Sequence, residues 1–177
     1  LNITVGGTFS SQNFESSIFQ TLDDGSTSIF SGDEFNNNVT SNFSDIYAGV
    51  KYKFVTGKFT FAPGVNLHSY SYSNEQLGMK YEDNQTKLLP NFYANFQFKK
   101  SENLRFNYSR SVEYPDINSI AEGYVFNNYN SLFQGNNEIE NGLYDKFNLN
   151  YSSFSLFNYT NVSASLSYTK MNDPIKN

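Results

Sequence analysis

The sequence has no cysteine and no tryptophan, and His68 is its single histidine. Thiol chemistry is therefore excluded, and so is a metal site built on clustered histidines. The chain also lacks the Gly-x-Ser-x-Gly motif, the P-loop motif and any paired-carboxylate arrangement. We therefore expect no enzymatic activity, no cofactor and no metal.

Concentrated charge and long apolar runs are also missing. The 12 Lys and Arg residues are scattered among 17 Asp and Glu residues, so nucleic acid, which needs a basic patch, is not an expected partner. No window approaches the roughly 18 consecutive apolar residues of a membrane-spanning helix. Transmembrane β-strands remain open, because they show only an alternation over about 10 residues. The chain opens at Leu1 without a signal-peptide pattern, and we expect it to be an internal segment of a longer protein.

The sequence is rich in aromatic residues, with 18 Phe and 14 Tyr set among Asn, Ser, Thr and Lys. In residues 45–54, "DIYAGVKYKF", apolar residues alternate with polar or small ones, which predicts a strand with one apolar face. The pattern returns at 58–72, 87–100, 104–112, 146–152 and 162–169, with a less regular strand near 2–20. We expect an all-β fold of about seven long strands in an antiparallel up-and-down meander. Pro63 interrupts one strand, and we expect a bulge or kink there because proline lacks the amide hydrogen.

The expected connections alternate in length. Those near 55–57, 100–103 and 154–160 are short, whereas those near 21–37, 73–86 and 113–142 are long and polar. In a meander every second connection lies at the same end of the sheet, so one end carries tight turns and the other long loops. Outer-membrane barrels have this asymmetry. A soluble β-sandwich with wet outer faces is the alternative interpretation.

Two stretches carry a family resemblance, "NLRFNYSRSVEYPDINSI" (103–120) and "SLFQGNNEIENGLYDKFNLNYS" (131–152). They resemble the C-terminal half of TonB-dependent outer-membrane receptors of the kind abundant in Bacteroidetes. The matching positions are Ser109, Arg110, Tyr114 and Pro115 in the first stretch, and Gly135, Asn136, Ile139 and Glu140 in the second. Asn137 stands where that family usually has proline.

This resemblance implies a large transmembrane outer-membrane β-barrel of about 22 strands around a plug, of which residues 1–177 would form an internal part. It implies uptake of a bulky nutrient such as a siderophore, glycan or peptide. The implied partners are outer-membrane lipid, the remaining barrel and plug, an inner-membrane energy-coupling complex and a candidate surface lipoprotein. The alternative function is a non-transporting surface β-protein, such as an adhesin or extracellular matrix protein.

The loop from Glu113 to Leu143 is the candidate recognition site, because connections of about 30 residues are usually functional or disordered. Aromatic rings in it could stack on a ligand, and its polar side chains could form hydrogen bonds. The predicted substrate-binding residues are Tyr114, Asp116, Glu122, Tyr124, Tyr129 and Gln134, with Phe133 as a further ring. The more common role of such aromatics is to form the loop's own core.

We expect neither His68 nor the acidic groups at 23–25 and 32–34 to bind a metal ion. His68 shares its parity with Asn66 and Tyr70, so we expect it to line the barrel interior rather than bind a metal. The acidic groups at 23–25 and 32–34 could bind calcium through oxygen ligands, but their spacing matches no EF-hand and a solvated loop is expected.

Overall fold

The computed structural model describes the chain from residue 1 to residue 173, except for residues 31, 129, 137–140 and 156. Its long strands are β1 (Asn2–Ser17), β4 (Asn36–Lys51), β6 (Phe59–Gln76), β7 (Met79–Lys99), β8 (Glu102–Glu113), β11 (Gly142–Ser155) and β12 (Thr160–Asp173). The short elements are β2 (Phe19–Thr21), β3 (Thr27–Ile29), η1 (Asp33–Phe35), β5 (Phe54–Thr56), α1 (Ile117–Ile120), β9 (Tyr124–Asn128) and β10 (Ser131–Gln134).

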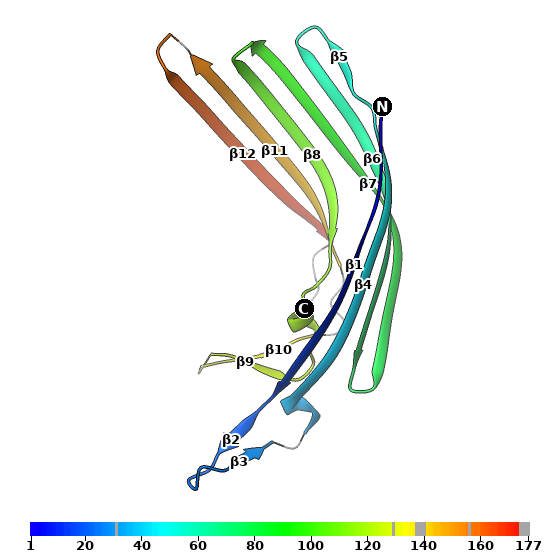
Figure 1. Ribbon diagram of the computed structural model, residues 1–177, viewed down its shortest axis with the longest axis vertical. Coiled ribbons are helices and arrows are strands. Elements are labelled where there is room, and N and C mark those ends of the chain that lie inside the picture. Colours follow the sequence, from blue (N-terminus) through cyan, green and yellow to red (C-terminus); the bar gives the residue numbers. More distant parts are fainter. Residues whose placement is uncertain (31, 129, 137–140, 156, 174–177) are drawn as a thin grey trace.

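The seven long strands form one antiparallel sheet in the order β1-β4-β6-β7-β8-β11-β12, with β5 paired to β6. Each long strand pairs with the next one along the chain, so the predicted all-β meander is confirmed. The sheet curls like a trough, with a concave and a convex face (Figure 1). Among the described residues, β1 and β12 have no strand on their outer edges.

The convex face is the apolar one. Ile46, Leu88 and Leu166 project from it and are 55%, 65% and 67% exposed. The concave face carries mostly polar and aromatic side chains, and Tyr70 there is 5% exposed. A soluble sheet would bury its apolar face and wet its polar one, so this arrangement is reversed. Curvature explains the difference in burial, because it crowds side chains on the inside and spreads them on the outside.

Pro63 interrupts hydrogen bonding without shifting the register. Lys51 pairs with Gly64 and Phe54 pairs with Phe61, so β4 and β5 follow one continuous register along β6. The Tyr52 amide donates to the Pro63 carbonyl at 3.0 Å, but proline has no N–H to return to Tyr52. The expected bulge is therefore wrong, and the alternative of a kink stays a prediction. Proline leaves a two-residue gap between β4 and β5.

The expected loop at 73–86 is wrong. β6 continues to Gln76 and β7 starts at Met79, so a two-residue turn of Leu77 and Gly78 joins them. Both turn residues have positive φ, 51° and 72°, as in the tight hairpin turns that match strand twist. The sequence predicted a loop here because both faces of the hairpin are polar and the apolar alternation stops. The ladder of backbone hydrogen bonds nevertheless continues to the turn.

The two ends of the sheet differ, as the alternating connections predict. Short turns join β5 to β6, β7 to β8 and β11 to β12 at one end (Figure 1). The opposite end carries the β2–β3 hairpin with η1, the long β6–β7 hairpin, and the segment between β8 and β11 that contains α1, β9 and β10. The α1 turn lies on the inner side of the curl (Figure 1).

Candidate functional site

The segment after β8 folds back onto the concave face. Ile120 and Ala121, at the end of α1, are 1% and 0% exposed and pack with Val39 of β4 and Tyr72 of β6. Phe14, Phe43, Tyr114 and Ile117 surround this cluster. The segment thus shares a hydrophobic core with the sheet, because its buried residues pack against strand residues and not only against one another.

Two buried amides hold the backbone of this segment. The Gln76 side chain donates to the Ile120 carbonyl at 3.1 Å and accepts from the Glu122 amide at 3.2 Å. The Asn37 side chain accepts from the Gly123 amide at 2.8 Å and donates to the Tyr124 carbonyl at 3.3 Å. Irregular backbone can be buried only when its polar groups are paired. Asn37 and Gln76 therefore take the place of a β-ladder.

The sequence did not identify Asn37 or Gln76 as site residues. Both fell in stretches expected to be long loops, at 21–37 and 73–86. The structure puts them in β4 and β6, where they are 5% and 3% exposed. Gln76 has the same parity as His68 and Tyr70, so extending the strand pattern past residue 72 would have placed it on the inner face.

Tyr114 lies at the centre of an aromatic cluster. Its ring centroid is 4.8 Å from Phe43, 5.4 Å from Tyr70 and 5.7 Å from Tyr72. Burial raises the pKa of the Tyr114 hydroxyl above its usual value, and a tyrosine hydroxyl is protonated at neutral pH even without such a shift. Its buried oxygen has no hydrogen-bond partner within the described part of the chain.

A cavity of about 280 Å³ lies beside this cluster. Its lining residues are Ser10, Gln12, Ser41, Phe43, Tyr72, Tyr114, Pro115 and Asp116. One oxygen of Asp116 accepts from the Asn118 amide at 3.0 Å and caps α1, while the side chain stays exposed. Aromatic rings beside hydroxyl, amide and carboxylate groups can bind a polar molecule with apolar faces.

The other predicted residues lie elsewhere. Glu122 and Gln134 line a second hollow of about 360 Å³ near Leu77, and the Gln134 side chain donates to the Glu122 carbonyl at 2.8 Å. The Tyr124 ring lies 6.1 Å from Phe35. Tyr129, Ile139 and Glu140 are outside the described residues. The structure thus brings Tyr114 and Asp116 together and separates them from Glu122 and Gln134, and ligand binding by these residues stays a prediction.

Comparison with known protein families decides the setting of this sheet. Residues 1–177 match the outer membrane protein beta-barrel family. The chain belongs to this family. It is therefore a bacterial outer-membrane β-barrel protein, which confirms the predicted fold class and location. Neither the curated proteins nor the solved structures compared with the chain gave a match.

Membership explains the reversed faces of the sheet. The convex apolar face meets lipid and the concave face lines the barrel lumen, as in outer-membrane barrels generally. The soluble-sandwich interpretation is therefore excluded. No helix in the described part of the chain is long and apolar enough to cross a membrane. The end with long loops is extracellular and the end with short turns is periplasmic by the same family rule.

His68 lines the lumen of this outer-membrane barrel, as its parity predicts. Its Nδ1 lies 2.9 Å from Asp45 Oδ1, and its ring stacks between Tyr47 and Tyr70 at centroid distances of 5.0 and 5.4 Å. The sequence could not identify Asp45 as the partner, because it lies 23 residues away and is brought close by the β4–β6 register. No cluster of three or more metal-ligating side chains occurs among the residues described.

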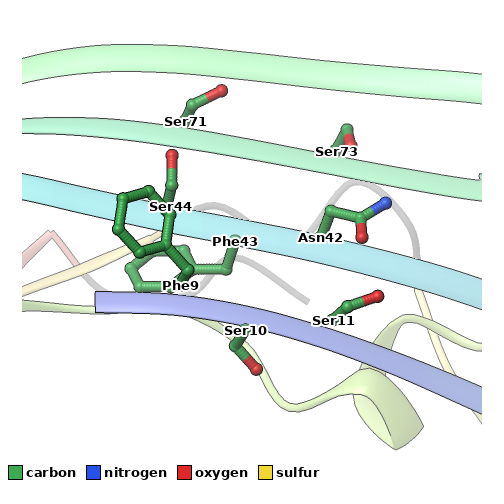
Figure 2. Close-up of a pocket in the computed structure, with 8 residues that line it drawn as sticks. All are labelled: Phe9, Ser10, Ser11, Asn42, Phe43, Ser44, Ser71 and Ser73. Carbon is green, nitrogen blue, oxygen red and sulfur yellow. The ribbon is translucent and has the colours of Figure 1, made fainter. Parts of the chain in front are cut away.

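The lipid-facing surface of the barrel changes character beyond the apolar band. Two registered rows cross β1, β4 and β6 there, Phe9-Ser44-Ser71 and Ser11-Asn42-Ser73. These residues surround a shallow hollow of about 450 Å³, and Figure 2 shows them spread across the three strands. Short hydroxyl and amide groups follow the last apolar residues, Ile46 and Leu67. The hydrocarbon region therefore ends near this level on these strands.

Proposed function

We propose that this chain forms part of the wall of a TonB-dependent uptake barrel. Strands outside the chain would pair with the open edges of β1 and β12, because backbone groups cannot remain unpaired in lipid. A plug would close the lumen, and an inner-membrane energy-coupling complex would drive transport. The resemblance around Ser109, Arg110, Tyr114 and Pro115 supports this assignment over other outer-membrane barrels.

The observation that carries the proposal is the cavity beside Tyr114. It lies on the lumenal face at the extracellular end, where an incoming solute would first meet the barrel. The rings of Phe43, Tyr72 and Tyr114 offer apolar surfaces, while Gln12 and Asp116 offer polar groups. A siderophore, glycan or peptide combines both kinds of surface. In this proposal the residues bind and release the solute and catalyse no reaction.

Energy-dependent uptake tests the transport proposal. Cells that produce the full-length protein would be offered labelled probes: a ferric siderophore, an oligosaccharide and an oligopeptide. We expect uptake of one probe class, and we expect a protonophore to abolish that uptake while surface binding persists. Uptake that continues with the protonophore would identify a passive pore. The absence of uptake and of binding for every probe would favour a non-transporting surface protein.

Filling the cavity tests the binding site. We expect Ser10→Trp to lower probe binding at least about tenfold, because an indole would occupy much of a cavity of about 280 Å³. Ser11→Trp is the matched control, since the next residue of β1 faces lipid near the interface, where aromatic residues are common. Equilibrium binding to purified full-length protein gives the readout. Equal probe binding by the two variants would show that this cavity is not the binding site.

A further inference from the structure

Two rows of outward-facing residues cross β8, β11 and β12 on the lipid side. The first row is aromatic: Tyr108, Phe147 and Tyr168 are register partners, with ring centroids 4.9 and 6.0 Å apart. The next outward-facing row toward the extracellular end is Arg110, Asp145 and Lys170. Aromatic girdles mark the boundary between hydrocarbon and headgroups. The charged row therefore lies at headgroup level.

The negative charge of Asp145 is paired with Arg110, and both of its carboxylate oxygens accept hydrogen bonds. Its carboxylate accepts from Arg110 Nε and Nη2 at 2.8 and 2.9 Å and from the Tyr108 hydroxyl at 2.7 Å. The Asn172 side chain donates to it as well, and Asp145 is only 7% exposed. Such a bidentate pair fixes the plane of the guanidinium. Asp145 thus positions Arg110 and leaves little acceptor capacity of its own.

The two cations of this row keep unused donors. Only two of the five guanidinium N–H groups of Arg110 are needed for the contacts with Asp145, and the Arg110 side chain is 34% exposed. Lys170 flanks Asp145 on the opposite side, is exposed, and forms no ion pair with any residue that the structure describes. With two positive charges beside one negative charge, the row of Arg110, Asp145 and Lys170 is cationic.

We propose that Arg110 and Lys170 bind the phosphate of an outer-leaflet lipid headgroup. Guanidinium and ammonium donors are the groups that bind phosphate oxygens best, and lipid headgroups surround the convex face at this level. Tyr168, in the row below, would contact the start of the acyl chains. This inference rests on membership of the barrel family and is independent of the transport proposal.

Binding of lipid A to the full-length protein in detergent tests the site. We expect phosphorylated lipid A to bind at least about tenfold more tightly than the same lipid after phosphate removal. We expect Lys170→Gln to lose a large part of this preference, and the combination with Arg110→Gln to abolish it. Lys170→Gln leaves the contacts of Asp145 intact, so it stays informative if the double variant fails to fold.

Lys80→Gln is the matched control, because Lys80 also projects outward but forms an ion pair with Glu82 at 2.5 Å in the β6–β7 hairpin. It should bind phosphorylated lipid A like the unaltered protein. Native mass spectrometry reports the bound lipid, and the heat-dependent gel shift of folded barrels reports folding. Equal affinity for the two forms of lipid A, or unchanged binding by Lys170→Gln, would overturn the proposal. The proposal would also be overturned if the surface formed by Arg110 and Lys170 bound another protein and not lipid A.

Discussion

Leu166→Lys should reduce the free energy of folding into a bilayer by about 1–3 kcal/mol, because a lysine on a barrel's lipid face costs about 2–4 kcal/mol at the midplane and about 0–1 kcal/mol near the interfaces, and Leu166 lies between these two levels. Leu166 lies on β12 between Ala164 and Tyr168 on the convex face and is 67% exposed. That exposed surface meets hydrocarbon, where an ammonium group loses its hydration. Urea titration of the full-length protein in phospholipid vesicles measures the change.

Ser165→Lys provides the comparison for this experiment. Ser165 is the neighbouring residue and faces the lumen, where its hydroxyl donates to Asn150 Oδ1 at 2.8 Å. A lysine there stays in water, so we expect a loss well below that of Leu166→Lys. Losses of equal size would show that the two faces of the sheet have been assigned wrongly, since only one of them can meet lipid.

Ile120→Ala should release the segment between β8 and β11 from the lumenal face. Ile120 is the largest fully buried side chain of the described residues, at 1% exposure, and joins the segment to Val39 and Tyr72. Removing a buried isoleucine costs about 2–5 kcal/mol, which is comparable to the stability of many local units. Hydrogen exchange of the full-length protein should therefore show faster exchange at residues 117–124.

The sheet itself should be unaffected by this change. Amides of β7 and β8 near the membrane should keep their protection, because Ile120 contacts only the extracellular part of the sheet. Ile29→Ala serves as the control, since Ile29 in β3 is 65% exposed and should leave exchange at 117–124 unchanged. Unaltered protection in Ile120→Ala would mean that the segment does not depend on this core.

The membrane-embedded parts of the strands could be predicted residue by residue. The apolar set of residues 45–54 projects from one face and its polar set from the other, because lipid on one side and water on the other impose a strict period of two. The same reasoning placed His68 in the lumen. It failed at 73–86, where the hairpin extends into water on both sides and no environment enforces alternation.

The candidate site was only partly predictable for a related reason. Tyr114 and Asp116 stood out as an aromatic and an acidic residue in a long connection, and the structure places both on one cavity. Phe43, Tyr72, Asn37 and Gln76 belong to other strands, and nothing near them in the sequence indicates contact with residues 114–124. Their roles follow from the register between strands and from the inward fold of the segment after β8.

The sequence by itself thus determined the membrane-embedded parts of the strands, their faces and the asymmetry of the two ends, because each depends on local alternation or on the length of a connection. The tertiary structure alone decided which distant side chains meet. Asp45 with His68, Asp145 with Arg110 and Ile120 with Val39 are all set by pairing register and curvature. These properties depend on backbone hydrogen bonds between strands, which are the same for nearly every residue type and therefore leave little trace in the sequence.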